Sequence, residues 1–343
     1  MIDKSMGVNL RDIIPRKEIK FEFLEGKKIA IDFSNSAYQF LSSIRQPDGT
    51  PLMDSKGRIT SHLMGIWTRF TNLMQRNIQL AIVLDGKAPI LKIKEQEQRA
   101  LRKEFAAEKL KQAQQEEDIE SMAKYAKQTT RLSSEMTAEA RELMEAMGLP
   151  VIQAPSESDA QIAYMCKQEE VFAAATSDVD VLLHGCPRSI TNLTLSQKRK
   201  LPNGTYVKIT PELVELPEVL KSLGITHDQL IAIAILVGTD YHPGIHRVGP
   251  KTALKLVKQH PSLDQLFREV EADFDWKEIM DLFKKMPVTK EYKLEWKKPD
   301  VEKIKEILVD RHEFSPERVD ATLEKLKATT KKKEQKGLGD FFT

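Results

Sequence analysis

The sequence has few cysteines and no long apolar run, and both absences exclude classes of protein. The two cysteines, Cys166 and Cys186, lie in no CxxC motif, and a chain of 343 residues needs no disulfide, so we expect a reducing cytosol. The seven histidines and two cysteines show no Cys/His zinc spacing. The longest apolar run, 230–237, is far too short to cross a bilayer. Residues 1–11 lack the apolar core of a signal peptide.

The chain also has little net charge, because 53 basic residues nearly balance 51 acidic ones. Hydrophobic residues make up 41% of the chain, which favours a folded core over disorder. A nucleic-acid partner is still compatible with this balance: if several acids gather in one pocket, the remaining surface is basic. The length allows one large domain or two smaller ones, and we find no internal repeat.

Seven carboxylates occur where an α/β fold would bring them together. Residues 28–33 and 80–84 are short isoleucine- and valine-rich runs, which we expect to form buried parallel strands ending at Asp32 and Asp85. In doubly wound sheets, ligands gather outside the carboxyl ends of the strands. The other acids follow predicted strands at 151–153 and 171–176 or a buried helix, and are Glu157, Asp159, Asp178, Asp180 and Asp240. So many gathered charges require a cation, which predicts metal-assisted cleavage of phosphodiesters.

Each acid also has a purely structural interpretation, since an aspartate after a strand is often a turn or helix cap. Asp178 and Asp180 would share one face of an extended chain, where their charges strain each other unless a cation lies between them. Glu157 and Asp159 converge only if Glu157 precedes the helix. Ser156 with Asp159 also fits a capping box, so local sequence leaves both roles of Asp159 open.

Most of the remaining chain has helical patterns. Residues 61–74 place apolar side chains on one side, and Gly148 and Pro150 end a helix over 137–147. From residue 90 to about 127, long charged side chains predict a polar helix or helix pair. Asp240 follows the most apolar helix, where a cap is the commoner role. Residues 325–337 are typical of a mobile tail. The other predicted helices are at about 157–169, 211–223, 226–237, 250–259, 262–269, 276–285, 301–310 and 316–328.

Several stretches together resemble the structure-specific 5′ nuclease (XPG-like) family, in particular its archaeal flap endonucleases. They are AIDFSNSAYQFL (30–41), ITSHLMGIWTR (59–69), VLDGKAPILK (83–92), APSESDAQIAY (154–164), TSDVDVLLHG (176–185), LVGTDYHPGIHRVGPKTAL (236–254) and QKGLGDFF (335–342). All seven acids match the family's metal-binding positions, although the family commonly has glutamate where this chain has Asp159. The resemblance implies two Mg²⁺ ions, for which Mn²⁺ can substitute, and magnesium-dependent cleavage of 5′ flaps.

This resemblance also implies the fold. It is an α/β fold with a PIN-like, mixed, mostly parallel central sheet flanked by helices, a helical arch over the active site and a helix–two-turn–helix element. The implied boundaries are a nuclease core over 6–330, with an N-terminal region (6–105), the arch (87–135) and an internal region (123–265) containing the helix–two-turn–helix (241–258), and a flexible tail over 331–343.

Two basic residues match the family's pair that faces the scissile phosphate, Lys92 and Arg99. The sequence supports this match independently, because residues 87–111 carry eight basic and four acidic side chains close to Asp85. If this stretch is helical, Arg99 lies two turns beyond Lys92 and faces the same way. A charged run of this kind is more often a solvated helix, so proximity to Asp85 is the reason to prefer a catalytic role.

Further positions match DNA contacts of the family. Tyr38 matches the aromatic residue that stacks on an unpaired base, and Arg45 and Thr60 match positions that hold the 3′ end of the upstream strand. Gly249 precedes a helix whose N-terminal amides can hold a DNA phosphate, with Lys251 beside it. In the family the preceding loop binds potassium through backbone carbonyls, which correspond here to those of Gly244, Ile245 and Val248.

The end of the chain matches the peptide motif that binds a PCNA-type sliding clamp, through Gln335, Leu338, Phe341 and Phe342. Adjacent phenylalanines on a lysine-rich tail have no core to join, which favours a partner over docking on the same domain. The family implies Okazaki fragment maturation and long-patch base excision repair, by a monomer in an archaeal cytoplasm or, for a eukaryotic chain, in the nucleus. The alternatives are a 5′→3′ exonuclease or bubble-cutting relative, and a non-catalytic clamp-associated scaffold, which the complete acid set disfavours.

Overall fold

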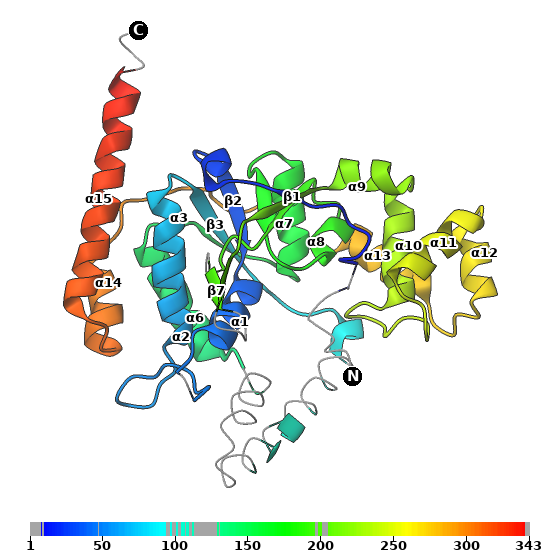
Figure 1. Cartoon of the computed structure of the whole chain (residues 1–343), viewed down its shortest axis with the longest axis horizontal. Coiled ribbons are helices and arrows are strands. Elements are labelled where there is room, and N and C mark those ends of the chain that lie inside the picture. The colour runs from blue at the N-terminus through cyan, green and yellow to red at the C-terminus, as the bar shows by residue number, and fades with distance from the viewer. Residues whose placement is uncertain are drawn as a thin grey trace.

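A seven-stranded sheet forms the centre of the computed structural model, with helices on both faces (Figure 1). The described residues are 8, 10–46, 48–93, 97, 101, 104–106, 108–109, 112, 129, 131–195, 198–200 and 205–339, with the backbone alone at 198–200 and 330–339. The sheet has the order β1-β9-β6-β5-β2-β3-β4. Its strands are β1 Lys17–Glu18, β2 Lys28–Asp32, β3 Gln79–Leu84, β4 Val151–Gln153, β5 Ala173–Ala175, β6 Arg188–Thr191 and β9 Glu212–Glu215. A separate antiparallel pair consists of β7 Lys198–Lys200 and β8 Tyr206–Lys208.

The strands that precede the predicted acids all run parallel. β2 pairs with β3 on one side and with β5 on the other, with Asp32 opposite Val83 and Ile31 opposite Ala175. β4 and β6 continue the parallel pairing outward, whereas β9 and β1 form antiparallel pairs at one edge. The predicted parallel strands at 28–33 and 80–84 are therefore confirmed. Because parallel strands end at the same edge of a sheet, β5, β2, β3 and β4 direct their following residues to one place.

Helices cover both faces of this sheet (Figure 1). The helices within the described residues are η1 Phe21–Leu24, α1 Phe33–Ser43, α2 Ser61–Gly65, η2 Ile66–Phe70, α3 Thr71–Gln75, α6 Ser134–Ala146, α7 Ser158–Lys167, α8 Asp180–Leu183, α9 Leu216–Leu223, α10 His227–Val237, α11 Pro250–Gln259, α12 Leu263–Glu269, α13 Trp276–Lys285, α14 Val301–Lys305, η3 Glu306–Arg311 and α15 Pro316–Gly339. The predicted helices at 61–74 and 137–147 are confirmed, the first with a π-helical middle, η2. No single helix in these described ranges has the length and apolar composition to cross a membrane, and α9 with α10 passes that test only as a pair bent by 81°.

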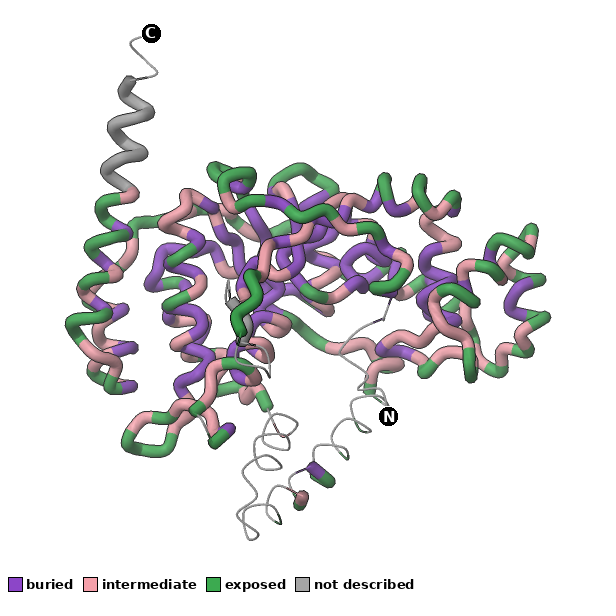
Figure 2. The backbone as a smooth tube through the Cα atoms, in the orientation of Figure 1, coloured by how far each residue is buried: buried purple, intermediate pink, exposed green. Residues whose placement is uncertain are grey.

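Alternate residues of the central strands line two different cores. Ile29 and Ile31 pack with α1, η2 and α6, whereas Ala30 belongs to the core formed with α7, α8 and α10. The second face carries small side chains, Ala30 with Ala81 and Ala174, so α7 can lie close to the sheet. Figure 2 shows the buried chain concentrated in these strands and their covering helices. This close packing fixes the start of α7 next to the carboxyl ends of β2 and β3.

Two expected elements differ from the structure. The helix expected over 211–223 is wrong in its first part, because Glu212–Glu215 forms β9 and only Leu216–Leu223 is helical. Leu213 and Val214 are buried in opposite cores, so this short strand lacks the apolar–polar alternation that would have revealed it. The last helix, expected to end near 328, continues to Gly339, so the backbone expected to be a mobile tail at 325–337 is helical. Lysine, glutamate and glutamine in this segment are strong helix formers.

Candidate active site

The carboxyl ends of β2 and β3 are joined through Asp32 and Asp85. Asp32 caps α1 by accepting the Asn35 N–H at 3.2 Å, and it also accepts the hydroxyls of Ser158 and Thr176 at 3.3 Å each. The N–H of Ser158 donates to Asp85 Oδ1 at 2.8 Å. Asp32 is therefore both a helix cap and a member of the acid cluster, which consists of Asp32, Asp85, Glu157, Asp159, Asp178, Asp180 and Asp240. Burial, followed by the charge of Asp85, raises the pKa of Asp32 to about 7.

The start of α7 brings two further acids to the same place. Glu157 occupies the N-cap position with an extended backbone, and its side chain makes no capping bond. Asp159 lies in the first turn of the helix. The capping box of Ser156 with Asp159 is wrong, because the Ser156 hydroxyl donates to the carbonyl of Lys87 at 3.0 Å. Glu157 precedes the helix, which is the condition under which the sequence allowed Glu157 and Asp159 to point to the same place.

Asp159 has a buried carboxylate oxygen, Oδ1, that lacks a hydrogen-bond donor among the described residues. Burial raises the pKa of Asp159 well above its usual range, and the charges of Asp32 and Asp178 raise it further. A buried carboxylate oxygen without a donor is costly, and a bound cation would satisfy it.

Asp178 and Asp180 follow β5, but not in an extended chain as predicted. Asp180 is the first residue of α8, and its N–H donates to Asp178 Oδ1 at 3.1 Å. An aspartate side chain that accepts a nearby backbone N–H favours a turn at this position, and this competes with continued strand. Burial raises the pKa of Asp178 to about 6, and burial together with Asp178 raises the pKa of Asp180 well above its usual range.

Lys92 lies between Glu157 and Asp240, with its Nζ atom 2.5 Å and 3.0 Å from their carboxylates. Asp240 is not the helix cap that its local sequence suggests, because α10 ends at Val237 and its C-cap is Gly238. Burial alone would lower the pKa of Lys92, but the attraction of Glu157 and Asp240 outweighs it and raises the pKa. The ammonium group therefore stays charged and neutralises part of the negative charge of Glu157 and Asp240.

This donor set fits a hard divalent cation, because carboxylate oxygens are the ligands that Mg²⁺ and Mn²⁺ prefer. Asp159 has an unsatisfied oxygen, and the pKa values of Asp32 and Asp178 are raised, so a bound cation would stabilise the ionised form of all three carboxylates. Within the described ranges, no three or more His, Cys, Asp and Glu side chains stand in a ready-made metal cage. Lys92 forms ion pairs with Glu157 and Asp240, so metal ions that bind these two carboxylates must compete with the lysine.

The raised pKa values predict how stability depends on pH without metal. Between about pH 4 and 7 the folded protein keeps protons on Asp32 and Asp178 that the unfolded chain has lost, so the free energy of unfolding should fall as pH rises. We expect a decrease of up to about 3 kcal/mol from Asp178, at about 1.4 kcal/mol per pKa unit. Urea unfolding in a chelator at several pH values measures this slope. An Asp178→Asn variant with the same slope as the unchanged chain would contradict the prediction.

Sequence reasoning missed Tyr241, whose hydroxyl donates to Glu157 Oε2. Tyr241 directly follows Asp240, and its ring is buried with 8% of the residue exposed. The only local signal is its position in the segment LVGTDYHPG beside a predicted ligand.

The predicted DNA-contact residues Tyr38, Arg45 and Thr60 lie on α1 and on the loop that follows it. Tyr38 is half-buried on α1, the helix that Asp32 caps. Arg45 begins a loop closed by bridges to Pro51 and between Met53 and Ile59, and its guanidinium donates to the carbonyl of Gly49 at 2.6 Å. Thr60 ends this loop and is 5% exposed. Arg99, the second predicted phosphate-facing residue, lies outside the described residues.

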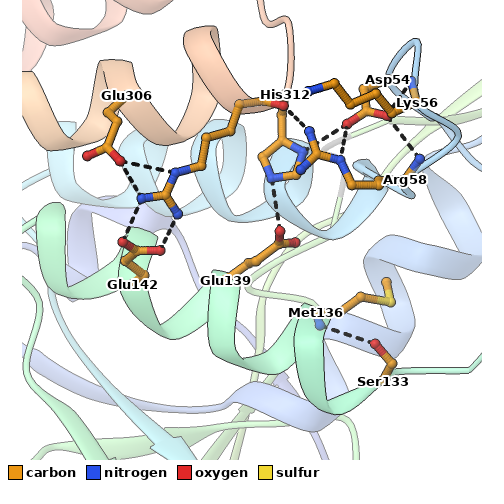
Figure 3. Close-up of polar contacts among 10 residues, drawn as sticks. Asp54, Lys56, Arg58, Ser133, Met136, Glu139, Glu142, Glu306 and His312 are labelled. Carbon is orange, nitrogen blue, oxygen red and sulfur yellow. Dashed lines mark hydrogen bonds and ion pairs between the residues drawn. The ribbon is translucent and has the colours of Figure 1, made fainter.

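A polar network fastens this loop to the C-terminal part of the chain (Figure 3). The buried imidazole of His312 lies 3.2 Å from Asp54 of the loop and 3.2 Å from Glu139 of α6. Arg58 pairs with Asp54 at 2.8 Å and also donates to the carbonyl of Arg311. Arg311 in turn binds Glu142 through two nitrogens and also binds Glu306. Residues far apart in the sequence therefore fix the loop that carries Arg45 and Thr60.

The loop between α10 and α11 contains the predicted potassium and phosphate positions. Gly244 has φ 83°, and a Cβ there would lie 2.5 Å from the Gly238 nitrogen, so only glycine fits. The N–H of Val248 donates to the carbonyl of Ile245 at 3.1 Å, which folds the loop on itself. Gly249 is the N-cap of α11 and has open space beside it. Lys251 is exposed in the first turn of this helix.

The predicted clamp motif falls at the limit of what the structure describes. Gln335 and Leu338 lie in the helical backbone of α15, without a description of their side chains. Phe341 and Phe342 lie outside the described residues.

Comparisons with known proteins agree with this geometry. The XPG N-terminal domain family matches residues 6–106, and the XPG I-region family matches residues 148–240. Flap endonuclease 1 of Pyrococcus horikoshii is 50% identical over 340 residues, which are 98% of each chain. Flap endonuclease 1 of Hyperthermus butylicus is 49% identical over 330 residues, 94% of each chain. The solved flap endonuclease-1 of Methanococcus jannaschii is 41% identical, with a TM-score of 0.76, over 95% of this chain and all of that one.

The chain belongs to the XPG family of nucleases, among its flap endonucleases. Its activity is therefore that of a flap endonuclease, a nuclease that hydrolyses DNA. The catalytic core of Rad2, solved in complex with DNA substrate, shares the fold at 23% identity and a TM-score of 0.68.

Proposed function

We propose that the chain hydrolyses 5′ flaps at the single-strand/duplex junction with two Mg²⁺ ions held by the seven acids. The observation that carries this proposal is the unsatisfied, buried Asp159 Oδ1 among carboxylates whose pKa values are raised by mutual repulsion and burial. Asp159 would contribute to both ions. The first ion would be held by Asp32, Asp85, Glu157 and Asp159, and the second by Asp178, Asp180 and Asp240 with Asp159.

The side chains around this cluster have separate tasks. Bound divalent cations would supply Lewis-acid activation of water and stabilise charge on the phosphoryl oxygens. Lys92 keeps its charge and reaches the cluster from the segment after β3, so it is placed to move from Glu157 and Asp240 to a scissile phosphate. We assign the same task to Arg99. Asp32 and Asp180 are buried, so their carboxylates lie away from bulk water.

DNA binding is assigned to backbone and shape rather than base sequence. The N-terminus of α11, with Gly249 and Lys251, would hold a duplex phosphate, and Tyr38 would stack on the unpaired base near the cut. Arg45 and Thr60 would contact the 3′ end of the upstream strand from their fastened loop. We include the arch over 87–135, the helix–two-turn–helix at 241–258 and a potassium ion on the carbonyls of Gly244, Ile245 and Val248 in this proposal.

Cleavage of a double-flap DNA tests the proposal. A 5′-labelled substrate incubated with Mg²⁺ should yield one incision near the junction, and the same substrate with a chelator should stay intact. A 3′-labelled copy separates endonuclease cleavage from 5′→3′ exonuclease activity, which would produce a ladder. Tight flap binding without any incision in Mg²⁺ or Mn²⁺ would contradict it and support a scaffold role.

We also propose that residues 335–342 bind a PCNA-type sliding clamp, which would place the enzyme at replication forks and repair sites in an archaeal cytoplasm. The supporting observation is the spacing of Gln335, Leu338, Phe341 and Phe342 in the sequence, the first two of which lie at the far end of α15. In Figure 1 the C-terminal end of this helix extends away from the body of the protein, which leaves room for a partner. A clamp would raise the local concentration of the enzyme at nicks and flaps.

Changing both phenylalanines to alanine is expected to abolish stimulation by the clamp and leave clamp-free cleavage unchanged. Two large apolar side chains anchor such a peptide, and their loss should weaken clamp binding by at least about 100-fold. Calorimetry with the clamp and flap cleavage with and without it measure both effects. Lys333→Ala, outside the motif, is the matched control. Equal clamp affinity in the Phe341→Ala/Phe342→Ala variant and the control would refute the assignment.

A further inference from the structure

We propose that Tyr241 is a positioning residue that orients Glu157 for cation binding. Its hydroxyl donates to Glu157 Oε2, while Lys92 donates to the other oxygen, Oε1, at 2.5 Å. The inference deepens the proposed function, since it rests on Glu157 as a ligand of the first metal ion. It assigns a role to a residue that itself carries no metal-binding group in this site.

Glu157 needs an external support, because its own helix provides none. It occupies the N-cap position of α7, yet its side chain makes no capping hydrogen bond. A glutamate has three side-chain torsions, so an unsupported carboxylate samples many orientations. Among the described residues, Lys92 and Tyr241 donate side-chain hydrogen bonds to this carboxylate.

The two donors have different consequences for a cation. Lys92 is a competing positive charge, and its proposed task on the scissile phosphate requires it to leave Glu157. The Tyr241 hydroxyl is neutral at working pH, so it can hold one oxygen of Glu157 and leave the negative charge available to a metal ion. Partners of this kind orient metal-binding carboxylates in many sites, and they are hydrogen-bonded to the ligand rather than to the metal.

The tyrosine ring is itself held rigidly. It is 8% exposed and meets the ring of Phe283 on α13 edge to face, with centroids 5.3 Å apart at 61°. Its backbone N–H donates to the Thr239 hydroxyl at 3.1 Å. Thr239 N–H donates to the carbonyl of His242 at 2.8 Å, which closes a tight turn around Tyr241. The hydroxyl therefore reaches Glu157 from a fixed base, 84 residues away in the sequence.

The chain offers a matched control for this interaction. Tyr292 also donates its hydroxyl to a glutamate, Glu170, but Tyr292 is half-buried, Glu170 is exposed, and Glu170 is not one of the seven acids. Tyr292→Phe removes the same chemical bond without touching the proposed site. Tyr241→Phe keeps the buried ring and its contact with Phe283, so it isolates the hydroxyl.

The test measures Mn²⁺ binding to the DNA-free protein by calorimetry, well below the melting temperatures of the variants. We expect Tyr241→Phe to weaken Mn²⁺ binding by about 10-fold or more. Single-turnover flap cleavage should slow by a similar factor at low Mg²⁺, recover at high Mg²⁺, and occur with unchanged DNA affinity. A purely structural role would not produce this dependence on metal concentration. Tyr292→Phe should match the unchanged chain in every measurement.

A third variant, Glu157→Gln, separates the two possible failures. If it lowers Mn²⁺ affinity while Tyr241→Phe behaves like Tyr292→Phe, the positioning role of Tyr241 is overturned and Glu157 remains a ligand. If Glu157→Gln leaves Mn²⁺ affinity unchanged, the ligand assignment of Glu157 fails, and the inference about Tyr241 fails with it. Parallel losses in Glu157→Gln and Tyr241→Phe, absent in Tyr292→Phe, support both.

Discussion

Replacing Asp178 with asparagine should lower the rate of flap cleavage by at least about 10³-fold, which corresponds to about 4 kcal/mol of barrier. Asparagine has nearly the same shape and can still accept the N–H of Asp180, which Asp178 accepts at 3.1 Å. The change therefore removes a charge and leaves the turn before α8 intact. Single-turnover cleavage of a double-flap DNA measures the rate, and fluorescence anisotropy of the same DNA in a chelator measures binding.

The same variant should gain stability when no metal is present. Burial and neighbouring acids raise the pKa of Asp178 to about 6, so its charge is unfavourable in the folded protein at neutral pH. Melting in a chelator at pH 7.5 should occur at a higher temperature than for the unchanged chain. The matched control is Asp228→Asn, which removes an aspartate from an exposed ion pair with Lys284. Cleavage within tenfold of the unchanged chain would remove Asp178 from the proposed metal site.

Replacing Lys92 with methionine should also slow cleavage strongly, by about 10²- to 10³-fold, because a positive charge opposite the phosphoryl oxygens is lost. Its effect on metal binding should have the opposite sign to the loss of a metal ligand. Lys92 holds Glu157 and Asp240 at 2.5 Å and 3.0 Å, so its removal frees two carboxylates and makes the site more negative. We therefore expect tighter Mn²⁺ binding to the DNA-free protein together with slower cleavage.

This combination distinguishes Lys92 from a metal ligand and from a residue that only supports the fold. Calorimetry with Mn²⁺ and single-turnover cleavage give the two values on one preparation. Lys285→Met is the control, because Lys285 forms an exposed ion pair with Asp281 within α13 and should change neither value. Weaker Mn²⁺ binding in Lys92→Met would show that the lysine assists the cluster instead of competing with the cation.

Local patterns were sufficient where one physical rule decides the structure. The isoleucine- and valine-rich runs before Asp32 and Asp85 could be assigned to buried parallel strands, because such strands have few other compatible sequences. Local reasoning failed where two rules compete over a few residues. β9 is buried on both faces, so its pattern matched the start of a helix. Asp178 and Asp180 were expected in an extended chain, but the Asp178 side chain accepts the Asp180 N–H in a turn, and α8 begins at Asp180.

The sequence by itself determined that Asp32 and Asp85 would lie at one edge of the sheet, because each follows a strand that could be assigned as parallel, and parallel strands direct their carboxyl ends to one edge. The family resemblance, carried by short motifs, also needed no coordinates. Only the tertiary structure decided which group holds each acid: Lys92 between Glu157 and Asp240, and Tyr241 on Glu157. The same holds for His312, which joins Asp54 and Glu139. A local pattern specifies the direction of a side chain, whereas its partner depends on packing between segments that are distant in the sequence.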